Sequence, residues 1–318
     1  MDYILLIVGL ALLTVGADLL TKGCVGMAAR FRVPEFIVGL TVMAVGTSMP
    51  ELTVSTISAL NGSSDMAIGN VTGSNLFNTL IILGICALIR PMVFTRENVR
   101  RDIPLCIVAS ALLLVMALYI GSPAGIGRVE GIILFLLYIA FVLYSIRSAK
   151  RDMPDADAGT DDGKQSHGTM SWGRILLFIV IGLAGLIYGG NLCLNSATAI
   201  ARAWGVSEAI IAITIVAAGT SLPELASSVA AIANGKLSLA LGNVIGSNVA
   251  NILLILGLSG SIKPLTMGGI TPLDMWMVVG SAVLLLLSAL AIGQRRITRL
   301  EGALYLAVYV GYVILLMK

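Results

Sequence analysis

Charged side chains are scarce in this 318-residue sequence: only 12% of the residues are Asp, Glu, Lys or Arg, whereas 58% are hydrophobic. A soluble globular domain carries about 25% charged residues. The chain therefore has too little polar surface to cover a water-facing globule, and its mean hydropathy of +0.99 indicates a protein that faces lipid. Its net charge of +3 is too small to indicate nucleic-acid binding.

The residues that build soft-metal sites are scarce as well. The single histidine, His167, lies in a polar stretch, and the four cysteines lie in apolar segments without forming a CxxC pair. We interpret the cysteines as small buried side chains, not as disulfides or metal ligands. No G-x-x-x-x-G-K-[ST] motif occurs and no loop could hold a nucleotide-binding domain, which argues against an ATP-driven pump. We expect no enzymatic activity, no cofactor and no nucleotide.

Long apolar runs are what the sequence does contain, and a helix needs about 20 such residues to cross a bilayer. Ten runs occur, at residues 3–28, 34–60, 66–89, 103–120, 129–146, 173–203, 207–233, 238–261, 273–292 and 301–317. One polar stretch, 147–172, divides them into five and five. Its aspartates do not form an EF-hand, because Thr160 and Ser166 stand where that loop needs Gly and Glu. We therefore expect a linker.

Basic residues predict the orientation of these segments. Loops that follow the first, third, fifth, seventh and ninth segments hold 16 of the 20 Lys and Arg residues. The other side holds Arg128, Arg202, Lys263 and Lys318. Because basic loops stay in the cytoplasm, both termini are predicted outside and loop 147–172 is predicted cytoplasmic, in a multi-pass protein of the cell membrane.

The two halves contain an internal repeat. Residues 34–91 align with 207–264 at a constant offset of 173, without a gap, and 27 of the 58 positions are identical. The shared motif reads Gly-Thr-Ser-Met-Pro-Glu-Leu at 46–52 and Gly-Thr-Ser-Leu-Pro-Glu-Leu at 219–225, and each copy is followed by Gly-Ser-Asn. Since each half has an odd number of segments, the second copy is expected upside down in the bilayer, as in many transporters.

The predicted fold is therefore an all-α integral membrane protein with ten transmembrane helices in two inverted five-helix repeats. The first repeat covers 1–146, the linker 147–172 and the second repeat 173–318. Pro50 and Pro223 fall near the middle of their helices, so each repeat should carry a broken helix at the membrane midplane.

The repeated glutamates, Glu51 and Glu224, are the strongest functional signal. A carboxylate at the centre of a membrane helix costs about 2.5–3.5 kcal/mol on insertion scales, so it marks a functional site by default. None of the four helices of the repeated segments contains Lys or Arg. The compensating charge must then be a metal ion or a proton, and two carboxylates match one divalent ion.

Oxygen donors surround the two glutamates in the sequence. Thr47 and Thr220 stand four residues before them, and Ser74 with Asn78 and Ser247 with Asn251 show the same spacing of one helical turn. Such oxygens suit a hard cation like calcium, whereas the absence of sulfur and imidazole argues against zinc and copper. Asn70 and Asn243 fit either a ligand role or a hydrogen bond between helices.

The doubled motif resembles the alpha repeats of the calcium/cation antiporter superfamily, in its prokaryotic sodium/calcium exchanger branch, over essentially the whole chain. This resemblance implies a sodium/calcium antiporter that works by alternating access and takes Na⁺ and Ca²⁺ as substrates. It implies that Glu51 and Glu224 bind calcium and share sodium, with Asn78 and Asn251 completing the central site. The implied sodium sites use Ser48, Ser221, Ser74, Ser247 and the backbone carbonyls of Ala44 and Ala217, while Thr47 and Thr220 contribute carbonyls.

One departure from the family pattern concerns charge. Many relatives carry Asp at the position of Asn251, and potassium-dependent exchangers tend to carry Asp at both 78 and 251, whereas both are Asn here. The resemblance therefore disfavours potassium co-transport. A calcium/proton antiporter stays open as an alternative, because buried carboxylates also exchange protons, and a cation channel is a weaker one. We expect a monomer in the lipid bilayer.

Overall fold

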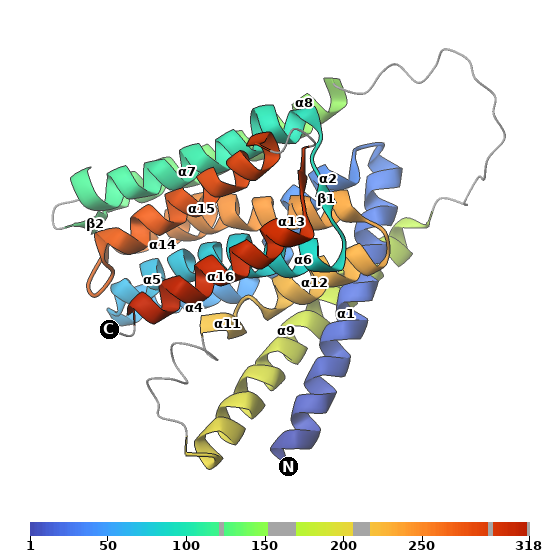
Figure 1. The fold of residues 1–318 in the computed structure, drawn as a ribbon, viewed down its shortest axis with the longest axis horizontal. Coiled ribbons are helices and arrows are strands. Elements are labelled where there is room, and N and C mark those ends of the chain that lie inside the picture. The colour runs from blue at the N-terminus through green and yellow to red at the C-terminus, as the bar shows by residue number, and fades with distance from the viewer. Residues whose placement is uncertain (121–123, 152–169, 206–216, 292–294, 317–318) are drawn as a thin grey trace.

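The computed structural model describes residues 1–120, 124–151, 170–205, 217–291 and 295–316, and this part of the chain is helical apart from four two-residue strands. The first half contains α1 (Asp2–Phe31), α2 (Glu35–Val38), η1 (Gly39–Met43), α3 (Ala44–Thr47), α4 (Met49–Asn61), α5 (Ser64–Leu76), η2 (Phe77–Ile82), α6 (Leu83–Ile89), η3 (Asn98–Asp102), α7 (Ile103–Val115), η4 (Met116–Ile120) and α8 (Arg128–Arg151), where η denotes a π-helical segment. The second half contains α9 (Trp172–Ala203), α11 (Ala217–Gly219), α12 (Leu222–Ala233), α13 (Leu237–Ala250), η6 (Asn251–Leu256), α14 (Gly257–Ile262), α15 (Pro272–Ala291) and α16 (Arg299–Leu316). Figure 1 shows their arrangement.

The membrane spans agree with the predicted segments in most places. Eight helices are long and apolar enough to cross a bilayer, and the bent pair Glu35–Thr47 and Met49–Asn61 raises the number to nine within the described residues. The predicted span 207–233 begins outside them, so the ten-helix inverted arrangement stays a prediction. Helices extend past the predicted apolar segments at some ends: α8 continues to Arg151, five residues beyond 146, and the helix predicted from 103 begins at Asn98. The rest of the predicted linker, 152–169, lies outside the described residues.

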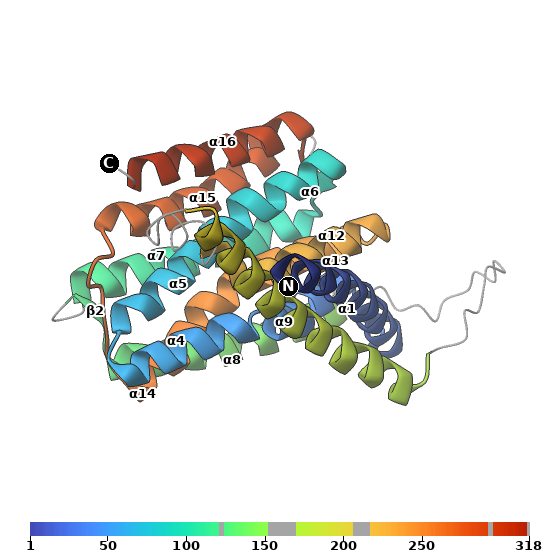
Figure 2. The ribbon, with the colours of Figure 1, turned by 90° about the horizontal axis from the view of Figure 1, so that it is seen from below.

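Helix α13, with η6 and α14, forms the centre of the molecule. Buried residues make up 94% of its most apolar window, against 22% for α16 at the periphery. In Figure 2, α13 lies between α16 on one side and α4 and α8 on the other. A helix that is surrounded by protein at this depth can carry polar side chains that no lipid touches.

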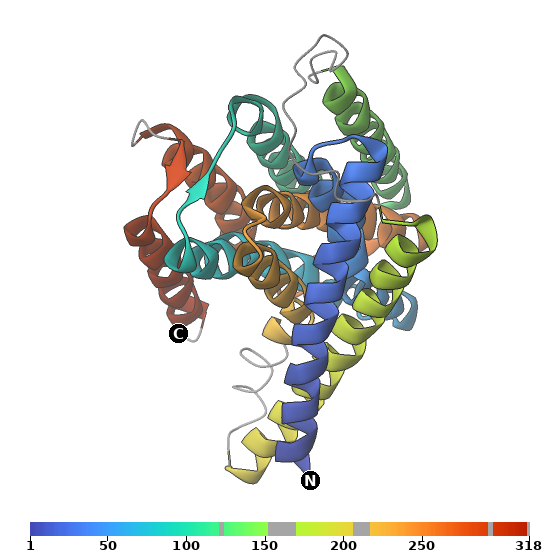
Figure 3. The same ribbon diagram turned by 90° about the vertical axis from the view of Figure 1, so that its right-hand side faces the viewer.

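Helices α1 and α9 pack along each other and project beyond the other helices (Figure 3). Their contact depends on glycine, because a Cβ added at Gly16 would lie 2.8 Å from the backbone oxygen of Gly182. Small residues at such places allow two membrane helices to approach closely. The pair therefore forms one unit beside the central helices.

Short strands join loops that the basic-residue pattern assigns to the same side. Strand β1 (Met92–Val93) pairs antiparallel with β4 (Arg296–Ile297), and both lie in loops predicted to be cytoplasmic. Strand β2 (Gly125–Ile126) pairs antiparallel with β3 (Leu265–Thr266), and both lie in loops predicted outside. These pairings agree with the relative placement of the four loops. Which side faces the cytoplasm stays a prediction.

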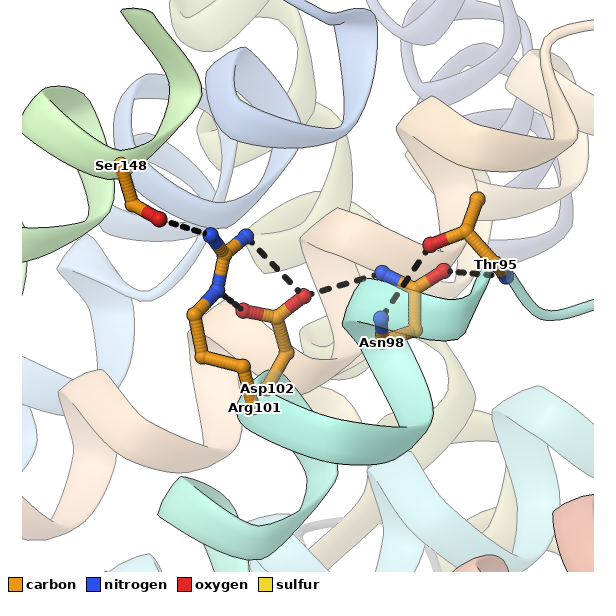
Figure 4. Close-up of polar contacts among 5 residues, drawn as sticks. All are labelled: Thr95, Asn98, Arg101, Asp102 and Ser148. Carbon is orange, nitrogen blue, oxygen red and sulfur yellow. Dashed lines mark hydrogen bonds and ion pairs between the residues drawn. The ribbon is translucent and has the colours of Figure 1, made fainter. Parts of the chain in front are cut away.

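A polar cluster anchors the start of the helix that η3 and α7 form (Figure 4). Thr95 and Asn98 exchange hydrogen bonds, since the Thr95 N–H donates to Asn98 Oδ1 at 2.9 Å and the Asn98 N–H to Thr95 Oγ1 at 3.2 Å. The buried Asp102 carboxylate accepts from Asn98 Nδ2 at 3.0 Å and from Arg101 Nε at 2.8 Å. Arg101 also donates to Ser148 on α8. The cluster therefore ties α7 to the end of α8, and its charges are paired.

Candidate cation site between the two broken helices

The prolines predict a helix break in each repeat, and the breaks lie at Ser48 and Ser221, two residues before each proline. Ser48 separates α3 from α4 with φ −82° and ψ 10°, and Ser221 precedes α12 with φ −90° and ψ 7°. Pro50 and Pro223 fall in the first turns of α4 and α12, where their missing N–H interrupts the helical ladder. The first broken span bends by 47°. Thr47 ends α3 and Glu51 lies in the first turn of α4, so the two residues stand on either side of the break.

Both glutamates are completely buried at the break. Glu51 and Glu224 each have 0% exposed surface and lie in the first turns of α4 and α12. The amino end of a helix is the positive end of its dipole, which stabilises a carboxylate without neutralising it. The two residues thus place two carboxylates where no solvent reaches them.

Each carboxylate receives a hydroxyl from the opposite repeat. Ser221 Oγ donates to Glu51 Oε1 at 3.0 Å, and Ser48 Oγ donates to Glu224 Oε1 at 2.7 Å. Ser74 Oγ also lies 3.4 Å from Glu51 Oε1 and 3.2 Å from Ser221 Oγ. The two copies of the motif therefore interlock at this point, and one site is built from both.

Five buried oxygens of predicted site residues have no hydrogen-bond partner among the described residues: Glu51 Oε2, Glu224 Oε2, Asn78 Oδ1, Asn251 Oδ1 and Ser247 Oγ. A buried polar atom without a partner costs about 1–3 kcal/mol, and more when it is charged. Carboxylate, amide and hydroxyl oxygens are the ligands of hard cations. A cation that these oxygens ligate would offset the cost.

Asn70 and Asn243 connect the repeats without offering a free oxygen. Asn70 Oδ1 accepts from Thr220 Oγ1 at 3.4 Å, while its Nδ2 lies 3.3 Å from the Glu51 carbonyl. Asn243 Oδ1 accepts from Thr47 Oγ1 at 3.4 Å, while its Nδ2 donates to two serines of α12. These contacts fit the interhelical role that the sequence left open.

The elements that carry Asn78 and Asn251 pack against the two broken helices, since η2 contacts α12 and η6 contacts α4. The side-chain hydroxyl of Thr47 is also 3.3 Å from the carbonyl of Ala44, and that carbonyl accepts the Ser48 N–H at 3.0 Å. Ala44 is buried, whereas the Ala217 side chain lies outside the described residues. Asn78 and Asn251 lie at two π-helical segments, η2 and η6, which occupy equivalent places in the repeats. Such segments often occur at functional sites.

Asn75 and Asn248 were passed over by the sequence reasoning. Asn251 Nδ2 donates to Asn75 Oδ1 at 3.0 Å, and Asn248 Nδ2 donates to Thr79 Oγ1 at 2.7 Å. Their recurrence in both Gly-Ser-Asn motifs was the available signal, because packing alone gives no reason to keep an amide at this depth.

Two cavities lie beside the break of the first repeat, and one of them reaches a loop predicted outside. One of about 210 Å³ lies between α4 and α9 and is lined by Pro50, Leu194 and Thr220 among others. The second, of about 420 Å³, reaches from Asp65 to Asn70 and Thr220. On the opposite side α1 packs on α12, the element that corresponds to α4 in the second repeat. Asn70 contacts both Thr220 and the Glu51 backbone, so these cavities approach the buried site.

Comparison with known proteins identifies the family. The sequence profile described as sodium/calcium exchanger protein matches residues 1–147 and 174–318. The chain belongs to the sodium/calcium exchanger family. This family member is 35% identical to the putative antiporter CaxA of Alkalimonas amylolytica over 98% of both chains. It is 30% identical to the sodium/calcium exchanger MaX1 of Methanosarcina acetivorans, over 99% of this chain and 98% of that one.

Solved structures of the sodium-calcium exchanger NCX_Mj resemble this exchanger-family chain closely. A structure soaked with zero Na⁺ and Ca²⁺ has a TM-score of 0.83 at 30% identity and covers 99% of this chain and 98% of that one. The recognised branch of the superfamily is thereby confirmed. The family consists of membrane transporters, so this chain is a multi-pass transport protein.

Proposed function

We propose that this protein is a sodium/calcium antiporter that exchanges Na⁺ for Ca²⁺ by alternating access. The observation that carries the proposal is the pair of fully buried carboxylates, Glu51 and Glu224, each with one oxygen that has no partner among the described residues. The two carboxylates carry a formal charge of −2, and the helices of the repeated segments contain no basic side chain to balance it. Bound cations that can exchange would balance it.

The identity of the ions rests on the donor set and on the family. Calcium takes 6–8 oxygen ligands, and sodium is likewise a hard cation that oxygen suits. The proposed site uses the side chains of Glu51, Glu224, Ser48, Ser221, Ser74, Ser247, Asn78 and Asn251 and the carbonyls of Thr47, Thr220, Ala44 and Ala217. Five of the side-chain oxygens are free of hydrogen bonds within the described chain, which supports their assignment as ligands.

The proposed architecture is ten spans in two inverted repeats, 1–146 and 173–318, with cytoplasmic linker 147–172 and both termini outside. The strand pairings and the interlocked hydroxyl–carboxylate contacts support it. The cavity of about 420 Å³ extends from Thr220 to Asp65 and Gly269, which lie in loops predicted outside, and this supports outward access to the site.

Calcium uptake into sealed vesicles tests the function. Purified protein is reconstituted into liposomes loaded with NaCl and diluted into sodium-free buffer containing radioactive calcium at equal, clamped pH. We expect uptake that requires the outward sodium gradient and stops when a sodium ionophore dissipates it. Vesicles that contain the Glu51→Gln variant measure the background uptake of calcium.

A second arm addresses the proton. Buried carboxylates without basic partners also accept protons, so the same vesicles are given an outward proton gradient with no sodium present. Uptake driven by protons alone would replace the proposal by calcium/proton antiport, and uptake that follows only the calcium gradient would indicate a channel.

A further inference from the structure

The amide of Asn251 is held in one orientation by a chain of hydrogen bonds that begins at a backbone carbonyl. Asn75 Nδ2 lies 3.2 Å from the carbonyl oxygen of Asn248, which can only accept. The Asn75 amide must therefore turn its Oδ1 the other way, where Asn251 Nδ2 donates to it at 3.0 Å. The Asn251 Oδ1 is left buried and has no partner among the described residues, as a ligand oxygen would.

The equivalent amide in the first repeat has no such restraint. Asn78 corresponds to Asn251 at the offset of 173, and Asn248 corresponds to Asn75. Neither Asn78 Nδ2 nor Asn78 Oδ1 has a hydrogen-bond partner among the described residues, and Asn248 Oδ1 also lacks one. The contact that orients Asn251 is thus missing at Asn78.

One difference between the repeats, at Thr79, contributes to this asymmetry. Asn248 Nδ2 donates to Thr79 Oγ1 at 2.7 Å, which turns its side chain to a hydroxyl of the first repeat. The residue equivalent to Thr79 is Ile252, which offers Asn75 no hydroxyl. Asn75 donates to a backbone carbonyl instead, and its oxygen becomes available to Asn251.

We infer that Asn75 is a positioning residue, which orients Asn251 so that its carbonyl oxygen faces the ion, and that the two central amide ligands are inequivalent. Position 251 must present a hydrogen-bond donor to Asn75, whereas position 78 is under no such requirement. The inference rests on the proposed function, since it concerns how the same site holds its ion.

Two double-mutant cycles test the inference in purified protein, with equilibrium binding of radioactive calcium in sodium-free buffer as the measurement. The first cycle combines Asn75→Ala with Asn251→Ala, and the second, matched cycle combines Asn248→Ala with Asn78→Ala. Because one hydrogen bond contributes about 1 kcal/mol, we expect Asn75→Ala to weaken calcium binding about fivefold. The Asn75 and Asn251 effects should not add, since each removes the same oriented oxygen.

The matched cycle should behave differently. Asn248→Ala keeps the backbone carbonyl that holds Asn75 and removes only a side chain that does not contact Asn78, so calcium affinity should change less than twofold and the two effects should add. Thermal unfolding without calcium identifies variants that do not fold, and Asn75→Ser replaces Asn75→Ala in that case.

The outcomes separate this inference from the proposed function. If the wild-type protein binds calcium but the effects of the substitutions at 75 and 251 add, the positioning role alone is overturned. Equal losses of calcium affinity in Asn75→Ala and Asn248→Ala would overturn it as well. Failure of the wild-type protein to bind calcium overturns the proposed function and the inference together.

Discussion

At the scale of the residue, the two glutamates are held by serines of the opposite repeat. Ser221 donates to Glu51 and Ser48 donates to Glu224. The second oxygen of each carboxylate has no hydrogen-bond partner in the described part of the chain. A hydroxyl donor stabilises the charged form without bringing a positive charge. The arrangement therefore leaves the negative charge for a mobile cation.

Removing that charge should abolish calcium binding. Glu51→Gln and Glu224→Gln keep the side-chain shape, but a divalent ion then faces one negative charge where it had two, in a poorly screened medium. Loss of one partner of a buried charge pair costs about 3–5 kcal/mol, which corresponds to about two to four decades in calcium affinity. Asn78→Ala and Asn251→Ala should do less, because they remove neutral ligands. Radioactive calcium binding and vesicle exchange measure these effects.

A matched substitution outside the site is the control. Glu35 pairs with Lys236 at 2.7 Å on the side predicted cytoplasmic, and both side chains are partly exposed. An exposed pair contributes about 0–1 kcal/mol, so Glu35→Gln should leave calcium affinity near the wild-type value. Near-normal exchange by both site variants would show that the two carboxylates are not the site.

At the scale of the element, the broken helices position these side chains. A continuous helix would satisfy the backbone carbonyls around Gly46 and Gly219, and it would place Thr47 and Glu51 on one face. The prolines prevent this, and the break at Ser48 and Ser221 lets each serine reach across to the other repeat.

Replacing the prolines should therefore impair the site without unfolding the protein. Pro50→Ala and Pro223→Ala restore an N–H and allow the helical ladder to continue through the break. We expect calcium affinity to fall by about 10–100-fold, the range seen when groups that orient metal ligands are lost. The thermal unfolding midpoint should stay the same or rise. Pro34→Ala, at the start of α2 and away from the break, is the control, and unchanged affinity in Pro50→Ala would show that the break is dispensable.

At the scale of the whole molecule, access to the site is uneven between the two sides. Two cavities reach Thr220 beside the break, whereas the cavity of about 490 Å³ at Glu35 and Glu97, on the side predicted cytoplasmic, has no predicted site residue in its lining. On that side α1 packs on α12. Antiport requires that the site open to one side at a time, and two similar halves packed differently provide that asymmetry. From the basic-residue bias we predict that the more accessible side faces outside.

Thiol labelling checks this orientation. Arg96 lies in a loop predicted cytoplasmic and Asn61 in a loop predicted outside, and both are exposed. In intact cells, a membrane-impermeant thiol reagent should label Asn61→Cys and label Arg96→Cys only after permeabilisation. The four native cysteines are buried and should contribute little background. The reverse labelling pattern would invert the proposed topology.

The sequence alone predicted the membrane class, nearly all helix locations and the two glutamates. Apolar runs determine spans locally, and a carboxylate at mid-span is visible from its position in the run. The doubled Thr-Ser-x-Pro-Glu motif and its Gly-Ser-Asn continuation placed every predicted site residue in one pair of repeats.

Only the tertiary structure decided how the two copies of the repeat combine. Sequence spacing paired Thr47 with Glu51 within one repeat, whereas the folded chain pairs Ser48 with Glu224 and Ser221 with Glu51, because a hydrogen bond over such separations depends on packing. Asn78 and Asn251 occupy equivalent places in the two repeats, and their surroundings differ where Thr79 faces Asn248. A repeat makes two halves chemically alike, but their contacts with each other need not be alike.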